Sequence, residues 1–190
     1  GLGDVYKRQA LDNILNRVSA RNLVEPHPDK NQMEVVYKAA LRAPDHAWLR
    51  PSRFIEVSGN SISKLSNIFE DYSLTLNDIT AEVAAKYKNA PFRAPMIIIL
   101  VSSYKEHPKV PAIEQKLSTA AAAQNIMLAL NAMKYSAIWR TGKLAFNRYV
   151  SNKLGLEDTE EILGYLYVGT PEGKNKNVPE LDIGNFVTRL

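Results

Sequence analysis

The chain carries the six residues MIIILV at positions 96–101, directly after Pro95 and directly before two serines. The run is continuous, apolar and rich in isoleucine, and it is too short for a typical helix. Such runs are typical of a strand that is buried on both faces of a sheet. The run therefore predicts the central strand of the fold, around which the other elements can be placed.

Helices are expected before and after this strand. A short helix is predicted at 11–18, and a second one begins at the cap Asp29 and ends before Pro44. Pro111 suits the first turn of a long helix that runs to about Lys134. The remaining expected elements are strands at 53–58, 136–139 and 162–168, a helix at 146–154 and a coil-like tail at 173–190.

The segment 62–88 is longer and more polar, and we interpret it as a helical excursion exposed at the surface. Too few strands precede helices for a doubly wound sheet, so the pattern favours an α+β sandwich. We expect a single domain at 11–190. Residues 1–10 lack an initiator methionine and the apolar run of a signal peptide, and we interpret them as a non-native or disordered leader.

Composition excludes several classes of protein. The net charge of +4 is mild and the basic residues are scattered, which disfavours nucleic-acid binding. The absence of cysteine excludes disulfides and thiol catalysis, and it fits a cytoplasmic location. The three histidines do not pair at metal-ligand spacing, so no metal site is expected. Polar residues interrupt the longest uncharged stretch, which disfavours a membrane span.

The common nucleotide-binding and hydrolase motifs are absent, and basic or polar residues at the ends of elements stand out instead. Arg17, Ser19 and Arg21 follow the first helix, where guanidinium groups could bind a phosphate in a bidentate manner. Taken alone, the same residues also fit a solvated helix end with favourable cations, and spacing favours that alternative.

Two further segments allow both a functional and a structural interpretation. Pro44 forces a turn that presents Asp45 and His46, which could hold a ligand, or Asp45 could simply pair with Arg42. The segment 139–142, WRTG, combines an aromatic face, a cation and a glycine turn, which suits a planar anionic cofactor or a core edge beside a surface arginine.

Glu114 and Gln115 open the long helix. They could act as an acid or only favour the positive end of the helix dipole, and the second interpretation is favoured. The sequence therefore shows no catalytic acid–base constellation.

Short motifs follow one another in a fixed order. They are RVSAR at 17–21, RAPDH at 42–46, LRP at 49–51 before RF at 53–54, NAPFRAP at 89–95, KVP at 109–111 with EQ at 114–115, IWRTG at 138–142 and GYLYVGTP at 164–171. Together they resemble the nitroreductase family, most of all its branch of YdjA-like NAD(P)H nitroreductases, over about residues 11–190. The resemblance implies an α-β-α sandwich with a central mixed or antiparallel sheet, in an interlocked homodimer with FMN at the interface.

By this resemblance, two segments of one protomer contact FMN, and they are formed by Arg17, Val18, Ser19, Trp139, Arg140 and Thr141. Arg42 and His46 would reach the same flavin from the partner. The nicotinamide segment corresponds to Ala129, Leu130, Asn131, Ala132, Met133 and Lys134. The flavin carries the chemistry and no protein group is assigned as catalytic. The implied activity is ping-pong transfer of hydride from NAD(P)H through FMN to nitro compounds, quinones or similar small acceptors.

The sequence departs from the family at three places. Val18 stands where a second arginine is common, Ser52 stands where an aromatic residue is usual, and Met133 to Tyr135 replace a turn that contains glycine. Two alternatives therefore stay open. One is a flavin dehydrogenase or dehalogenase of the same fold, in which 62–88 could form a substrate lid, and the other is a flavin-binding protein with little turnover.

Overall fold

The computed structural model describes residues 2–174 and 176–190. Its helices are α1 (Leu2–Leu15), α2 (Lys30–Ala40), α3 (Asn60–Leu74), α4 (Ala81–Asn89), α5 (Ala112–Ala132) and α6 (Arg148–Lys153). Its strands are β1 (Leu23–Val24), β2 (Ser52–Ser58), β3 (Met96–Ser103), β4 (Ser136–Arg140) and β5 (Glu160–Pro171). The sheet has the order β1-β5-β3-β2, and β4 also pairs with β5.

Strand β3 lies between β2 and β5 and is buried along nearly its whole length, as predicted. Its side chains alternate between two layers, because successive residues of a strand point to opposite faces. Met96, Ile98 and Leu100 pack with α2 and α5, whereas Ile97 and Ile99 pack with α3 on the other face. The apolar run thus supplies both halves of the core.

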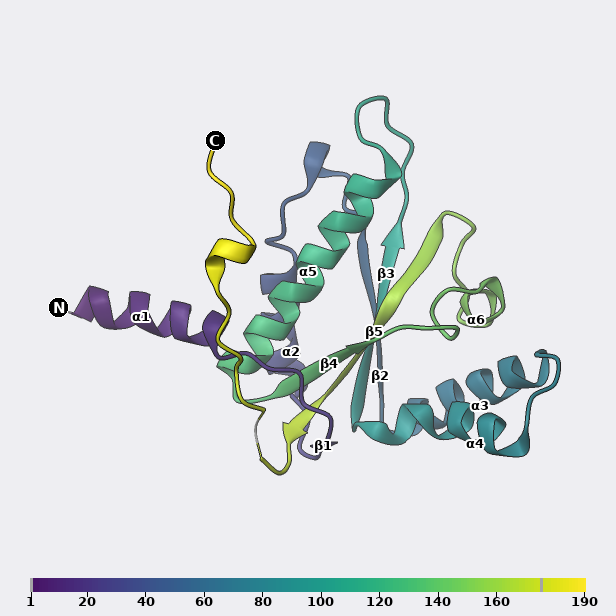
Figure 1. Cartoon of the computed structure of the whole chain (residues 1–190). Coiled ribbons are helices and arrows are strands. Elements are labelled where there is room, and N and C mark those ends of the chain that lie inside the picture. Colours follow the sequence, from purple (N-terminus) through teal and green to yellow (C-terminus); the bar gives the residue numbers. More distant parts are fainter. Residues whose placement is uncertain (1, 175) are drawn as a thin grey trace.

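Figure 1 shows the resulting layers, with α2 and α5 on one face of the sheet and α3, α4 and α6 on the other. The predicted α+β sandwich is confirmed. All named strand pairs are antiparallel, and the parallel pairing found is an isolated bridge between Ser19 and Ala137. The cap Asp29 is also confirmed, since its side chain accepts a hydrogen bond from Gln32 N at 2.9 Å and completes a capping box.

The prediction that 62–88 is an exposed excursion is wrong for its first half. The segment forms two helices, and α3 buries Leu65, Phe69 and Tyr72 against the sheet. Phe69 is fully buried, with its ring edge-on to Tyr165 at 5.4 Å between centroids. These apolar residues recur every three or four positions among polar ones, so the average polarity of the segment concealed a core helix.

Several boundaries also differ from the predicted ones. Helix α1 begins at Leu2 and ends at Leu15, so helix continues through most of the stretch interpreted as a leader. Strand β5 is longer than expected and reaches Pro171. Helix α6 begins at Arg148, after the cap Asn147. That residues 1–10 are foreign to the domain stays a prediction.

An ion pair joins β2 to β5 across the end of β3. Arg53 on β2 donates to both carboxylate oxygens of Glu160 on β5, at 2.7 and 2.8 Å, and Glu160 is buried. The Arg53 guanidinium holds the pKa of Glu160 below its usual value, although burial acts in the opposite direction. The pair therefore stabilises the fold while Glu160 is ionised.

Replacing Arg53 by methionine should lower the free energy of unfolding by about 2 kcal/mol near neutral pH, because a buried carboxylate loses a bidentate partner. A carboxyl group with a depressed pKa stabilises above its unfolded-state pKa and loses that contribution as the pH falls through its folded-state value. The difference between wild type and variant should therefore shrink below about pH 4. Urea unfolding across this pH range measures it. Lys116→Met, which breaks the exposed Lys116–Glu161 pair, is the matched control, and an equal loss in both variants would contradict the argument.

Candidate functional site

The segment that follows α1 lies along β4. Ser19 forms a parallel bridge with Ala137, and the Ser136 hydroxyl donates to the Val18 carbonyl at 3.5 Å. Strand β4 then leads directly to residues 139–141. The structure thus brings together the two segments predicted to contact FMN within one protomer, although they are more than a hundred residues apart in sequence.

Trp139 is fixed by its neighbours. Its indole Nε1 donates to the Leu163 carbonyl at 3.2 Å, and the ring lies over Gly164. A Cβ at Gly164 would lie 2.1 Å from Trp139 Nε1, so only glycine allows the ring to sit there. Thr141 follows as an exposed residue beyond the strand. The end of β4 therefore presents a fixed aromatic side chain beside a polar one.

Arg140 occupies the opposite face of β4. Its guanidinium lies over the ring of Tyr167, 5.4 Å from the centroid. Burial raises the pKa of Tyr167 to about 12, while Arg140 and Arg93 act in the lowering direction. The Nε atom of Arg140 is buried and has no hydrogen-bond partner among the residues that the structure describes. A buried donor of this kind requires an acceptor, and an anionic or carbonyl ligand would supply one.

Cations surround this position. Arg21, Arg93 and Arg140 line a hollow of about 460 Å³, and Arg21, Lys174 and Lys176 line an adjoining one of about 240 Å³. Glu172 belongs to both linings. Such clusters suit a phosphate group. Arg93, Lys174 and Lys176 were not predicted from the sequence, in which the available indication was two lysines within five residues of the end of β5.

The predicted nicotinamide segment, 129–134, forms the last turn of α5 and the turn after it. Asn131 donates to Asn13 Oδ1 of α1 at 2.8 Å, and Asn131, Ala132 and Lys134 line a groove of about 770 Å³ that also includes Val18. Leu130 is buried in the core. Lys134 adopts a φ of +68°, the conformation usually taken by glycine at a helix C-terminus.

The segment after α2 has an unusual backbone. Ala47, Trp48 and Arg50 have φ angles of +58°, +52° and +53°, which non-glycine residues rarely adopt. The Asp45 carboxylate accepts from the backbone N–H groups of Leu49 and Arg50, at 3.0 and 2.9 Å. Asp45 pairs with Arg50 at 3.4 Å, so the alternative in which it pairs with Arg42 is wrong. Arg42 is exposed.

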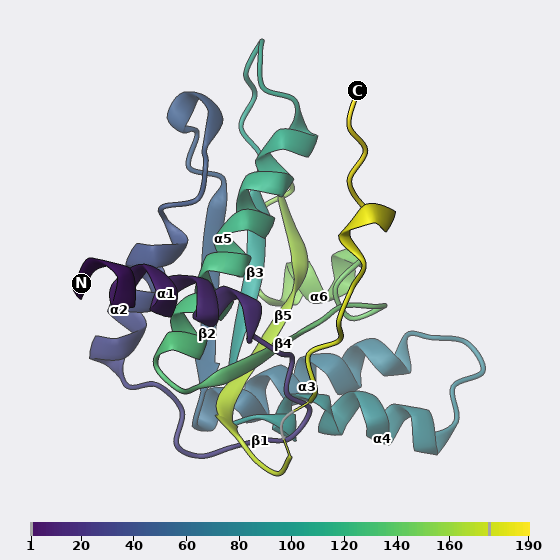
Figure 2. The same cartoon turned by 60° about the vertical axis from the view of Figure 1, so that its left-hand side comes forward.

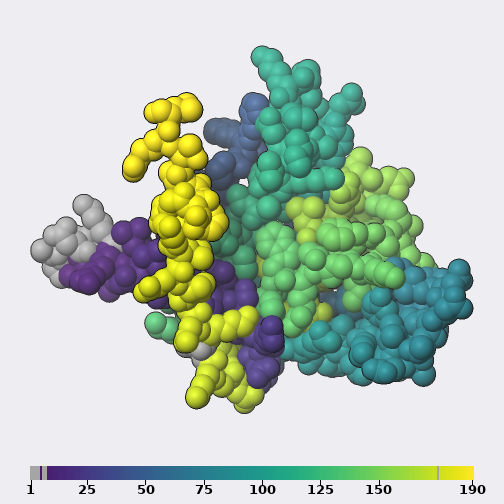
Figure 3. Space-filling view, in the orientation of Figure 1, coloured from purple at the N-terminus to yellow at the C-terminus, as the bar shows by residue number. Residues whose placement is uncertain are grey.

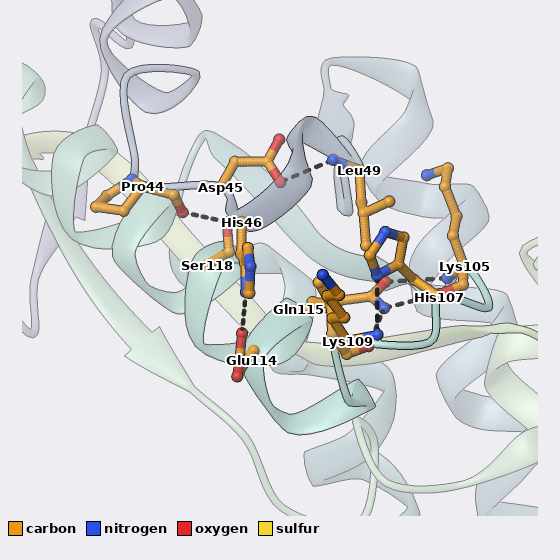
Figure 4. Close-up of polar contacts among 11 residues, drawn as sticks. Pro44, Asp45, His46, Leu49, Lys105, His107, Lys109, Glu114, Gln115 and Ser118 are labelled. Carbon is orange, nitrogen blue, oxygen red and sulfur yellow. Dashed lines mark hydrogen bonds and ion pairs between the residues drawn. The ribbon is translucent and has the colours of Figure 1, made fainter.

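Side chains at the start of α5 hold this segment in place, as Figure 4 shows. His46 Nδ1 lies 2.7 Å from Glu114 Oε2, and the Ser118 hydroxyl donates to the Pro44 carbonyl at 2.6 Å. Gln115 is buried and bonds both the N–H and the carbonyl of Lys105, at 2.9 and 2.8 Å. Glu114 and Gln115 thus have specific partners that the sequence did not reveal.

His46 and Val18 lie at opposite ends of α5. His46 contacts the first turn of this helix, whereas Ser136, which bonds to Val18, follows its last turn. A helix of 21 residues is about 30 Å long. The structure therefore does not bring His46 to the segment of Arg17 to Ser19 within one chain.

Within residues 2–174 and 176–190, no three or more His, Asp or Glu side chains gather as metal ligands would. In the part of the chain that the structure describes, no helix is both long and apolar enough to cross a bilayer.

Comparison with known proteins identifies the class. A family model described as "Nitroreductase family" matches residues 14–170. "Putative NAD(P)H nitroreductase YdjA" of Escherichia coli is 35% identical over 174 residues, which cover 90% of this chain and 94% of that protein. The fold, the cationic end of β4 and this similarity define an oxidoreductase. The chain belongs to the nitroreductase family.

Solved structures share the fold. A nitroreductase-like family protein from Bacillus cereus superposes with a TM-score of 0.80 at 21% identity, covering 95% of each chain. The FMN- and NADPH-dependent nitroreductase NfnB from Sphigopyxis sp. strain HMH gives a TM-score of 0.74 at 16% identity, covering 95% of this chain and 98% of that one. At these identities the comparisons establish the architecture alone.

Proposed function

We propose that the protein is an FMN-dependent NAD(P)H oxidoreductase that reduces nitro compounds, quinones or similar small acceptors. The observation that carries the proposal is the buried Nε of Arg140, which lacks a partner among the described residues and belongs to a side chain that lines a hollow together with Arg21 and Arg93. A flavin offers what this position lacks, because its ring has carbonyl and nitrogen acceptors and its tail ends in a phosphate. The residues present therefore fit FMN.

Each residue has a part in this proposal. Arg17, Ser19 and Arg140 would bind the polar edge of the flavin, and Trp139 would provide a wall beside its ring, with Val18 and Thr141 in backbone contact. Arg21, Lys174 and Lys176 would bind the phosphate end. FMN would supply hydride acceptance and release, while the fixed cations favour negative charge on the reduced ring.

We infer that the active unit is an interlocked homodimer. His46 contacts the first turn of α5, whereas the segment of Val18 lies beyond its last turn, so a second chain would bring Arg42 and His46 to a shared flavin. Helix α1 extends from the body of the protein in Figure 3, and the C-terminal tail does so in Figures 2 and 3. They expose large apolar side chains, among them Leu11, Leu15, Leu181 and Phe186, which a partner would cover.

NAD(P)H would bind beside the flavin, in the groove lined by Asn131, Ala132 and Lys134. Leu130 would support this segment from the core, and Ala129 and Met133 complete its turn. The flavin would alternate between donor and acceptor, which predicts ping-pong kinetics. Because reduced nicotinamides are produced in the cytoplasm, we expect the enzyme to act there.

The first test is the visible spectrum of the purified protein. We expect the absorption bands of a bound flavin, their loss when NADPH is added without oxygen, and their return when menadione or a nitroarene follows. A protein that shows no flavin bands after FMN is added would sink the proposal. Stable flavin bands that NADPH does not bleach would instead favour a flavin-binding protein with little turnover, the alternative that Val18 and Ser52 suggest.

A further inference from the structure

Residues 44–50, which we call the His46 loop, have a fixed conformation of unusual backbone geometry. Three non-glycine residues with positive φ angles follow His46 within four positions. Such residues carry strain, and the surrounding contacts must hold them. Here the Asp45 carboxylate, the Ser118 hydroxyl and the Lys105 ammonium all bond to the backbone of the loop. The loop is thus built to present particular side chains rather than only to connect α2 to β2.

His46 is one of the side chains that it presents. The ring is half exposed, with Nδ1 against Glu114 Oε2 at 2.7 Å (Figure 4). An ionised carboxylate can only accept, so this contact places a proton on Nδ1. No hydrogen bond to Nε2 is found among the residues described, and the side chain is 56% exposed. Glu114 therefore fixes both the tautomer and the direction of the ring.

An exposed contact between a histidine and a glutamate contributes little stability by itself. The pair joins residues 68 positions apart and connects the strained loop to the first turn of α5. This arrangement costs backbone strain and gains little stability in return, which favours a chemical role for the pair.

We propose that His46 delivers a proton from Nε2 to the acceptor on the partner's flavin, and that Glu114 is the positioning residue that holds His46 for this step. The inference rests on the proposed function. A quinone that becomes a hydroquinone takes up one hydride, from the reduced flavin, and one proton. His46 in its doubly protonated form gives that proton from Nε2, keeps the Nδ1 proton bonded to Glu114, and regains a proton from solvent.

Only one of the two half-reactions requires a proton donor. Transfer from NADPH to the flavin moves a hydride alone, whereas the acceptor needs a hydride and a proton. Ferricyanide takes electrons without any proton. Removing the Glu114 carboxylate should therefore slow only the step that consumes a proton.

The tautomer can be measured without any cofactor. The chain has three histidines, and two of them serve as references. His27 Nδ1 lies 2.8 Å from the Pro28 carbonyl and must carry a proton, whereas His107 Nδ1 accepts from Lys109 N at 3.2 Å and must lack one. In ¹⁵N spectra at about pH 8.5, where an imidazole is ordinarily neutral, His46 should resemble His27. In Glu114→Gln its signals should move toward those of His107.

Kinetics complete the test. Glu114→Gln should slow reoxidation of the reduced enzyme by menadione about tenfold, with reduction by NADPH and reoxidation by ferricyanide unchanged. Glu161→Gln, which removes another exposed carboxylate that pairs with Lys116 of α5, is the matched control and should change none of these rates.

An unchanged His46 tautomer in Glu114→Gln, equal slowing with both acceptors, or no slowing at all would each overturn the inference. These results differ from a failure of the proposed function. In that case the wild-type protein itself would bind no flavin or would resist NADPH, and the proton-transfer inference would fall with it.

Discussion

Replacing Arg140 by methionine should weaken FMN binding by about 100-fold, equivalent to about 2.7 kcal/mol. The Nε donor is buried and unpartnered among the described residues, so a ligand that bonds it recovers the cost of its burial. Methionine keeps an apolar stem over the ring of Tyr167 but removes the charge and every donor. Titrating free FMN with the apo-protein and following flavin fluorescence measures the change.

Lys153→Met is the matched control, because Lys153 also lies over a tyrosine ring, that of Tyr149 at 5.6 Å, but on α6. It removes the same charge and the same kind of cation–π contact and should leave FMN affinity unchanged. Arg140→Lys separates charge from geometry, since lysine keeps the charge but lacks Nε. Retention of wild-type affinity in Arg140→Met would contradict the assigned role, and retention in Arg140→Lys alone would assign the effect to charge.

Most of the fold could be predicted because its patterns are local. The apolar run at 96–101 is buried on both faces, as its composition predicts, and Asp29 caps α2 because carboxylates favour that position. The burial of α3 was not predicted from the sequence, because core and surface residues alternate along this helix. Its average polarity therefore resembles that of an exposed segment. Only the position of the sheet determines which face is covered, and that information is not local.

The candidate site was less accessible to sequence reasoning. Arg17 and Arg140 were proposed as site residues from the order of motifs, but nothing in the sequence shows that Nε of Arg140 is buried. The contact between His46 and Glu114 joins residues 68 positions apart. The positive φ of Trp48 also leaves no trace in the sequence, because the usual indicator of that conformation is glycine.

Replacing Phe69 by alanine should lower the free energy of unfolding by about 4 kcal/mol, the cost of truncating a fully buried phenylalanine. The side chain is 0% exposed and packs edge-on against Tyr165, whose hydroxyl donates to the Leu144 carbonyl at 2.6 Å. The truncation would therefore weaken the packing of the sheet as well as that of α3. Urea unfolding followed by circular dichroism measures it, and Phe69→Leu, expected to cost about 1 kcal/mol, provides a measurement if the alanine variant does not fold.

The same variants decide between two roles for the segment 62–88, a substrate lid or part of the core. If the segment is a mobile substrate lid, truncating Phe69 costs little stability and changes the KM for the acceptor instead. If α3 is a core helix, truncating Phe69 lowers the free energy of unfolding, and the KM of the folded protein for the acceptor stays unchanged. Leu74→Ala is the control, because Leu74 belongs to the same helix but is 69% exposed. Equal stability of Phe69→Ala and Leu74→Ala would contradict the core assignment.

Helix α3 packs on the sheet, and Arg140 lies on β4 of the same sheet, which is joined to β3 through β5. We therefore expect Phe69→Ala to weaken FMN binding only to the extent that it unfolds the protein.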